Sequence, residues 1–135
     1  MSKEILIDTN VLLGLILKDN QPQLNQIKEL LEQAEMGQTG LNCKSISIFE
    51  VIFVLLGKSY ELEKSEIVAI IKTLLNIPVI NFEEVDILNA ALDIFLNNGI
   101  SIIDSFLISS CILKKQDFFS FDKKASKTYK ELVKK

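Results

Sequence analysis

Four acidic residues stand at positions where the surrounding sequence is mostly apolar. Asp8 follows three apolar residues and Asp122 follows a mostly aromatic stretch, so each is expected at the end of a strand. Glu50 and Asp104 lie inside helix-like stretches whose residues three and four positions away are mostly apolar. A lone buried carboxylate is energetically costly, so these positions predict a compensating cation.

A shared divalent metal ion is the simplest chemistry for this set of acids. The chain contains no arginine, and no lysine directly flanks Asp8, Glu50 or Asp104. It also contains no histidine, which excludes a histidine base, a Ser-His triad and a His-ligated zinc ion. An all-oxygen ligand set suits Mg²⁺ or Mn²⁺. The structural alternative for each acid is a helix cap or a locally solvated position.

Composition indicates one globular domain spanning residues 1–135. The hydrophobic content of 48% is enough for a sizeable core. No apolar run reaches the roughly 18 residues that a membrane span requires, and Asp8 interrupts what would be the core of a signal peptide. Cys43 and Cys111 are far apart and are expected to be ordinary buried thiols, typical of a reducing compartment. We therefore expect a cytoplasmic protein without a membrane partner.

Charge is distributed unevenly along the chain. The overall net charge is −3, which is not that of a strongly basic nucleic-acid binder. Residues 1–113 carry a balance of −8, whereas residues 114–135 carry eight lysines and a balance of +5. Two interpretations of this lysine-rich end stay open: a solvated helix surface, or a patch that binds phosphate groups.

Hydrophobic periodicity predicts strands and helices in alternation. Strands are expected at 4–8, 41–44, 78–82 and 118–121. Helices are expected at 9–18, 23–36, 45–56, 65–75, 83–96 and 102–115, followed by a helical or frayed end. This alternation favours a parallel sheet with helices on both of its faces.

In this order and setting, the four acids resemble those of PIN-domain ribonucleases, especially the small VapC-type toxins of type II toxin–antitoxin systems. Residues 7–11 are similar to the first motif of that family and residues 49–50 to the second. Residues 103–105 resemble the third motif, with serine where alanine is more common, and residues 120–123 the fourth. PIN-like domains commonly end on a further short strand, for which residues 127–135 give no clear signal.

The resemblance implies an α/β fold: a three-layer α/β/α domain with a central, mainly parallel sheet of four to five short strands and about seven helices. It also implies metal-dependent cleavage of RNA phosphodiester bonds at a Mg²⁺ or Mn²⁺ site. The expected metal ligands and catalytic residues are Asp8, Glu50, Asp104 and Asp122. The groups expected to orient these carboxylates are Thr9, Asn10 and Ser120. The lysines that could contact the RNA backbone are Lys123, Lys124 and Lys127. The expected protein partners are a cognate antitoxin and a second copy of the chain.

Other functions are compatible with parts of the pattern. An aspartyl-phosphate enzyme of the haloacid dehalogenase type also begins with a strand-end aspartate, but it needs a second acid where Asn10 stands. A phosphoacceptor receiver domain would place its aspartate on a central strand in the middle of the chain. A non-catalytic PIN-fold module that binds RNA or protein, and a housekeeping PIN nuclease without an antitoxin, are the remaining alternatives.

Overall fold

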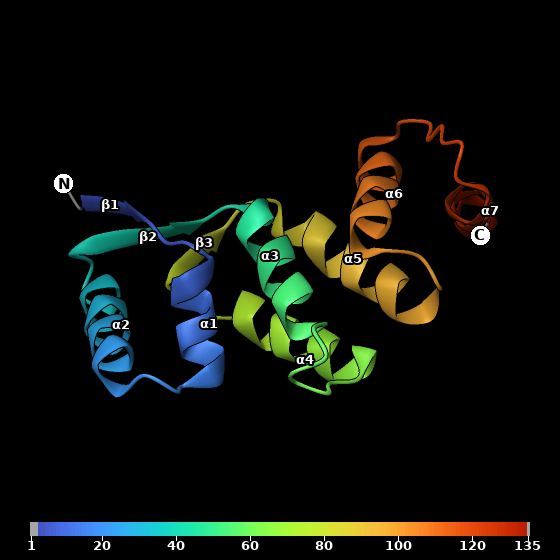
Figure 1. The fold of residues 1–135 in the computed structure, drawn as a ribbon. Helices are drawn as coiled ribbons and strands as arrows, with labels where there is room; N and C mark the ends of the chain where they lie inside the picture. The colour runs from blue at the N-terminus through green and yellow to red at the C-terminus, as the bar shows by residue number, and fades with distance from the viewer. Residues whose placement is uncertain (1–2, 135) are drawn as a thin grey trace. The chain divides into compact units, whose positions relative to one another are not determined.

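The computed structural model describes residues 3–134 and divides the chain into two compact units. The first unit runs to Glu83 and the second begins at Glu84 (Figure 1). The first contains all the strands assigned in the described residues, and the second is helical. Each unit is therefore described by itself.

A parallel sheet organises the first unit. Its strands are β1 (Lys3–Leu6), β2 (Thr39–Cys43) and β3 (Ile80–Phe82), in the order β1-β2-β3. The register pairs Ile5 with Leu41 and Leu41 with Ile80. Since all three strands run the same way, their carboxyl ends meet at one edge of the sheet, where open α/β sheets place ligands.

Helices connect these strands and bury the core of the first unit. They are α1 (Thr9–Leu17), α2 (Gln21–Glu35), α3 (Ser45–Leu55) and α4 (Lys64–Leu75). In Figure 1, α1 and α2 lie on the same side of the strands. Side chains buried to less than 2% exposure include Leu12, Leu41, Ile48, Ile52, Ile67 and Ile71. Each fully buried aliphatic side chain of this kind stabilises the unit by about 1.5–3 kcal/mol.

Local sequence signals account for several helix ends. The Asn20 side chain caps α2 by accepting a hydrogen bond from the Gln23 amide at 3.1 Å. Glu63 and Glu66 form a capping box at the start of α4. Gly37 follows α2 with a φ angle of 75°, a conformation that glycine adopts at little cost.

The second unit consists of α5 (Val85–Asn97), α6 (Ile102–Lys114) and α7 (Lys123–Val133). Helices α5 and α6 are tied by a buried hydrogen bond in which Ser109 Oγ donates to the Ile87 carbonyl at 3.0 Å. The core includes Ile94, Ile100, Ile108 and Ala125, with Phe118, Tyr129 and Leu132 packed against it. Helix α7 thus belongs to the packed core of this unit and is not frayed.

The predicted α/β class is confirmed, with seven helices and three parallel strands in the described residues. The prediction of four to five strands is too high, because residues 118–121 form no strand in the described chain. These aromatic residues lie in two environments: Phe118 packs on Tyr129, with ring centroids 5.6 Å apart, whereas Phe119 and Phe121 are exposed. An aromatic run is typical of a strand, but it does not supply the neighbouring strand that a sheet requires. No helix within residues 3–134 is long and apolar enough to cross a membrane.

Candidate active site

Asp8 lies between the sheet and the first helix. Strand β1 ends at Leu6, and the Ile7 amide continues the pairing by donating to the Asn42 carbonyl at 2.8 Å. Asp8 is exposed and caps α1: its Oδ1 accepts hydrogen bonds from the amides of Asn10 at 3.1 Å and Val11 at 3.3 Å. Asp8 is therefore a helix cap, as the structural alternative predicts. It uses only one carboxylate oxygen, so Oδ2 remains available to a cation.

Asp122 repeats this arrangement at the start of α7. Its Oδ1 accepts a hydrogen bond from the Ala125 amide at 2.9 Å, and the residue is exposed. Ser120 Oγ accepts a hydrogen bond from the Asp122 amide at 3.0 Å, while the Ser120 carbonyl accepts one from Ser126 Oγ at 2.9 Å. Ser120 thus fixes the backbone of Asp122 directly. At Asp8 the contact is different, because the Asn10 backbone amide donates to the Asp8 side chain.

Glu50 is exposed, which corrects the inference that it avoids a solvated face. The apolar residues near it along α3 are themselves exposed, with fractions of 65% for Ile46 and 51% for Phe53. The core is made by the other side of the helix, where Ile48 and Ile52 are fully buried. Apolar neighbours therefore do not imply a desolvated carboxylate here.

Asp104 lies in the first turn of α6 and is half-buried. The Ser101 side chain caps this helix by accepting a hydrogen bond from the Asp104 amide at 3.0 Å. Ile100 and Ile108 beside it are buried, so Asp104 lies at the edge of the core of the second unit. An acid in the first turn also interacts favourably with the helix dipole.

The four acids are divided between the units, with Asp8 and Glu50 in the first and Asp104 and Asp122 in the second. In the described part of the chain, no three or more Asp, Glu, Cys or His side chains form a group that could hold a metal ion. The convergence of the four acids therefore stays a prediction. Their donor chemistry fits a hard cation, because Asp8 and Asp122 are exposed carboxylates that each use a single oxygen for capping.

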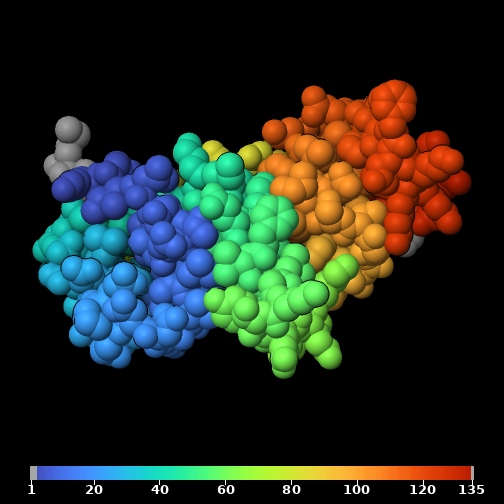
Figure 2. Space-filling view, viewed as in Figure 1, coloured from blue at the N-terminus to red at the C-terminus, as the bar shows by residue number. Residues whose placement is uncertain are grey.

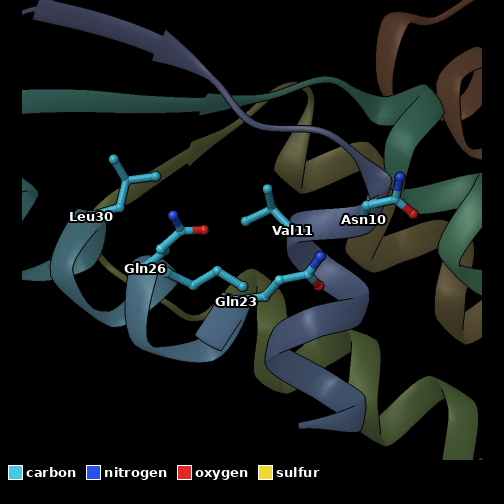
Figure 3. A pocket seen from close by; sticks show the side chains of 6 residues that line it. Asn10, Val11, Gln23, Gln26 and Leu30 are labelled. Atoms are coloured by element: carbon cyan, nitrogen blue, oxygen red, sulfur yellow. The ribbon is translucent and has the colours of Figure 1, made fainter. Parts of the chain in front are cut away.

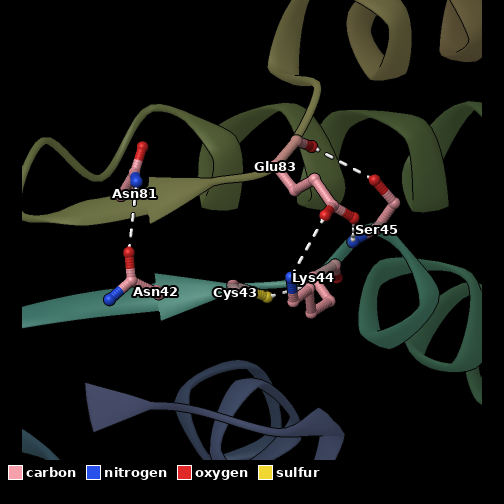
Figure 4. A network of polar contacts seen from close by, with 6 residues as sticks. All are labelled: Asn42, Cys43, Lys44, Ser45, Asn81 and Glu83. Carbon is pink, nitrogen blue, oxygen red and sulfur yellow. Dashed lines mark hydrogen bonds and ion pairs between the residues drawn. The ribbon is translucent and has the colours of Figure 1, made fainter. Parts of the chain in front are cut away.

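A polar network of the first unit surrounds Glu83, directly after β3 (Figure 4). Glu83 Oε1 accepts a hydrogen bond from the Ser45 amide at 3.1 Å, and Lys44 Nζ lies 3.4 Å from Glu83 Oε2. Ser45 Oγ in turn donates to the Glu83 carbonyl at 3.2 Å. The Ser45 amide hydrogen bond, helped by Lys44, lowers the pKa of the Glu83 carboxyl below its ordinary value. Glu83 therefore caps α3 from another strand.

Sequence reasoning assigned Glu83 only to the first turn of the following helix, and so missed this role. The helix begins later, at Val85. The signal was present in the sequence, since Glu83 follows a predicted strand as Asp8 does. Unlike Asp8, Glu83 has both carboxylate oxygens engaged by protein groups, which favours a structural role.

A small cavity of about 220 Å³ opens beside Glu83 at the carboxyl ends of the strands. It is lined by Leu6, Asn42, Cys43, Lys44, Asn81 and Glu83. Asn81 Nδ2 donates to Asn42 Oδ1 at 3.1 Å across neighbouring strands. Burial, together with the Glu83 charge, raises the pKa of the Cys43 thiol to about 11. Cys43 is therefore a protonated, buried thiol at neutral pH, as expected.

A second cavity, of about 350 Å³, lies between α1 and α2 (Figures 2 and 3). Figure 3 shows Val11 from α1 and Gln26 from α2 pointing toward each other across it. Its other lining residues are Asn10, Gln23, Ile27 and Leu30. This lining offers amide hydrogen bonds and apolar contacts but no charged group, so it has no acid–base or metal chemistry of its own.

Comparison with known proteins identifies the family. The sequence model of the PIN domain matches residues 5–131, so the chain belongs to the PIN domain family. The match spans both units and contains all four candidate acids. No match was found among curated proteins or among solved structures. PIN domains are generally nucleases that act on RNA and usually use divalent metal ions, which gives the chain a nuclease-type fold.

Proposed function

We propose that this chain is a metal-dependent endoribonuclease that hydrolyses RNA phosphodiester bonds. The observation that carries the proposal is the PIN domain match across residues 5–131, which includes Asp8, Glu50, Asp104 and Asp122. Because the match covers both units, we treat the chain as one PIN domain. The absence of histidine is compatible with this mechanism, since the reaction needs no histidine base.

The four acids would hold one or two Mg²⁺ or Mn²⁺ ions. When bound, such an ion lowers the pKa of a water molecule and neutralises charge on the phosphate and on the leaving oxygen. The chain's own contribution is to hold its carboxylates in place. At Asp8 and Asp122 the helix-capping hydrogen bonds go to Oδ1 and fix the side chain, so Oδ2 is not used by the cap and would bind the ion.

Residues beside these acids would act as positioning groups. The Asn10 backbone amide donates to Asp8 Oδ1 and so helps to hold the carboxylate, whereas Ser120 Oγ accepts from the Asp122 amide and holds its backbone. Thr9, the first residue of α1, completes the predicted set of groups that orient the carboxylates. Lys123 and Lys124 directly follow Asp122 and Lys127 lies one helical turn beyond Lys123, which supports a role for these lysines in contacting the RNA backbone near the cleavage point.

A toxin role is the finer form of the proposal. It rests on the resemblance of the four motifs to VapC-type toxins, and it implies a cytoplasmic protein with a cognate antitoxin and a homodimeric assembly. Exposed apolar residues on α3, including Ile46 and Phe53, are compatible with such an interface. Growth arrest on expression of this chain alone, relieved by a protein encoded next to it, would distinguish a toxin from a housekeeping nuclease.

RNA cleavage by the purified protein, with and without Mn²⁺ or Mg²⁺, tests the enzymatic function. We expect metal-dependent cleavage that is abolished by EDTA, by Asp8→Asn and by Asp122→Asn. Asp19→Asn removes an exposed acid from a loop and should leave the activity unchanged. If metal-loaded wild-type protein binds RNA without cleaving it, the nuclease proposal is wrong and the non-catalytic binding module is supported instead.

A further inference from the structure

Helix α7 has two faces of different chemistry. One face is buried: Ala125 and Thr128 are almost inaccessible, and Tyr129 and Leu132 pack on the core of the second unit. The opposite face carries a row of lysines at spacings of four, three and four residues, which we call the lysine stripe. It consists of Lys123, Lys127, Lys130 and Lys134. At 1.5 Å of rise per residue, the stripe spans on the order of 16 Å along the helix.

The lysine stripe borders a cavity of about 570 Å³ in the second unit. The remaining lining residues are Ser120, Phe121, Ser126 and Glu131. Phe121 has an exposed fraction of 92%, and Phe119 one of 83%. Their rings meet edge to face, with centroids 5.3 Å apart. A pair of exposed aromatic rings thus stands beside the row of positive charges.

The surface around the lysine stripe carries mostly positive charge. Glu131 is the acid of the cavity lining, and it lies 4.0 Å from Lys127 in an exposed ion pair, which contributes little energy. Lys124 does not belong to the stripe, because its side chain lies over Gly99, where an added Cβ would collide with the Lys124 ammonium group. The positive charge of α7 is thereby concentrated on the side that also presents Phe121.

We propose that the lysine stripe and Phe121 form a binding surface for single-stranded RNA. The lysines would follow the phosphate backbone, and an unpaired base would stack on the Phe121 ring. This combination of a basic track with exposed aromatic rings is the one used to bind single strands without strong sequence preference. An anionic membrane is a poorer fit, since an amphipathic helix needs a free apolar face and that face of α7 is buried. The inference rests on the proposed function for RNA as the substrate class.

Salt dependence of RNA binding, measured in EDTA so that no cleavage occurs, tests the stripe. The test variant is Lys127→Gln/Lys130→Gln/Lys134→Gln, and the matched control is Lys18→Gln/Lys28→Gln/Lys58→Gln, which removes the same charge from exposed positions of the first unit. Each phosphate contact contributes about 0.7 to the slope of log K against log salt for a single strand. We expect the test variant to lower the magnitude of the slope by about 2 and the control to leave it unchanged. Equal changes in both variants would overturn the proposal.

Phe121→Trp tests base stacking, since the chain contains no tryptophan and the substitution adds a single fluorophore. RNA should quench its emission, whereas inorganic polyphosphate, which has charge but no bases, should not. The control is Met36→Trp, at an exposed position that follows α2 in the first unit. Phe121→Ala should weaken RNA binding about 5- to 150-fold. If the emission of the introduced tryptophan is unchanged by RNA but varies with protein concentration, this surface serves self-association and the proposal is refuted.

These measurements are separable from the nuclease test. Stripe-dependent RNA binding in EDTA, by a protein that cleaves nothing in Mn²⁺, would reject the proposed nuclease function and keep the binding surface. Metal-dependent cleavage with an unaltered KM in the lysine triple variant would support the nuclease function and reject the binding surface.

Discussion

Asp8 and Asp122 each have two separable roles, one structural and one chemical, and substitutions can test them independently. Both residues cap a helix through Oδ1 and are proposed to bind a metal ion through the remaining oxygen. Asparagine caps a helix about as well as aspartate, whereas alanine cannot cap at all. Both substitutions remove the negative charge. The pair Asp8→Asn and Asp8→Ala therefore separates the hydrogen bond from the charge, and the same holds at Asp122.

The expected magnitudes follow from the hydrogen bonds. Loss of the charge near the helix N-terminus costs about 0.3–1 kcal/mol at an exposed position, equally in both variants. Loss of the cap costs a further 0.5–2 kcal/mol, roughly 1 kcal/mol in the typical case, in the alanine variant alone. For a chain of this size, 1 kcal/mol corresponds to a shift in Tm of about 3–5 °C.

Thermal or urea unfolding in EDTA measures the structural role, and unfolding with added Mn²⁺ measures the chemical one. A ligand at 100 times its Kd stabilises the folded state by about 2.7 kcal/mol, provided that the unfolded chain does not bind it. We expect wild-type protein to gain stability with Mn²⁺, and both Asp8 variants to lose most of that gain. RNA cleavage should fall to background in both, although Asp8→Asn stays well folded.

Two results would contradict this reasoning in different places. If Asp8→Ala is as stable as Asp8→Asn in EDTA, the capping hydrogen bonds do not contribute as described. If Asp8→Asn keeps its metal-dependent stabilisation and its cleavage activity, Asp8 is not a metal ligand. Asp19→Asn controls for the general effect of removing an exposed acid.

Two further predictions concern the strand-end network. Glu83 has a lowered pKa in the folded state, so its contribution to stability is complete above its ordinary pKa and is lost as pH falls through the lowered value. Glu83→Gln should therefore be less stable than wild type at pH 7. Urea unfolding at several pH values should show this difference in stability shrinking in acid. Cys43 has a pKa of about 11 and an exposed fraction of 2%, so it should react with a thiol reagent at pH 8 only when the protein unfolds. Cys111 should react first. Labelling of Cys43 in the folded protein would contradict its burial.

Helix positions were predictable from the sequence, because apolar periodicity and capping residues are local signals. The expected helix at 102–115 is observed as Ile102–Lys114, and Ser101 caps it. The strand at 118–121 was not predictable, because a strand is defined by its partner. The aromatic run at these positions is typical of a strand, but it could not supply a neighbouring strand, and in the structure Phe119 and Phe121 are exposed.

The candidate site was only partly accessible from sequence. The helix-cap alternative for Asp8 was correct, because aspartate before a helix is a local pattern. The role of Glu83 was missed, since its partner Ser45 is 38 residues away in the sequence. The separation of Lys124 from the lysine stripe could not be predicted from the sequence either, because it depends on the contact with Gly99 in another part of the second unit.

Glu50 shows why local apolar neighbours do not measure burial. Helix α3 is apolar on most of its circumference, so periodicity alone cannot decide which side enters the core. In the structure the hydrogen bonds between Ser45 and Glu83 fix the start of the helix at the sheet edge, and Ile48 and Ile52 are buried. Glu50 is then left among exposed apolar side chains. A carboxylate in that setting is hydrated in the isolated chain, so a metal-binding role for Glu50 must rest on the family resemblance and on mutagenesis, not on a cost of burial.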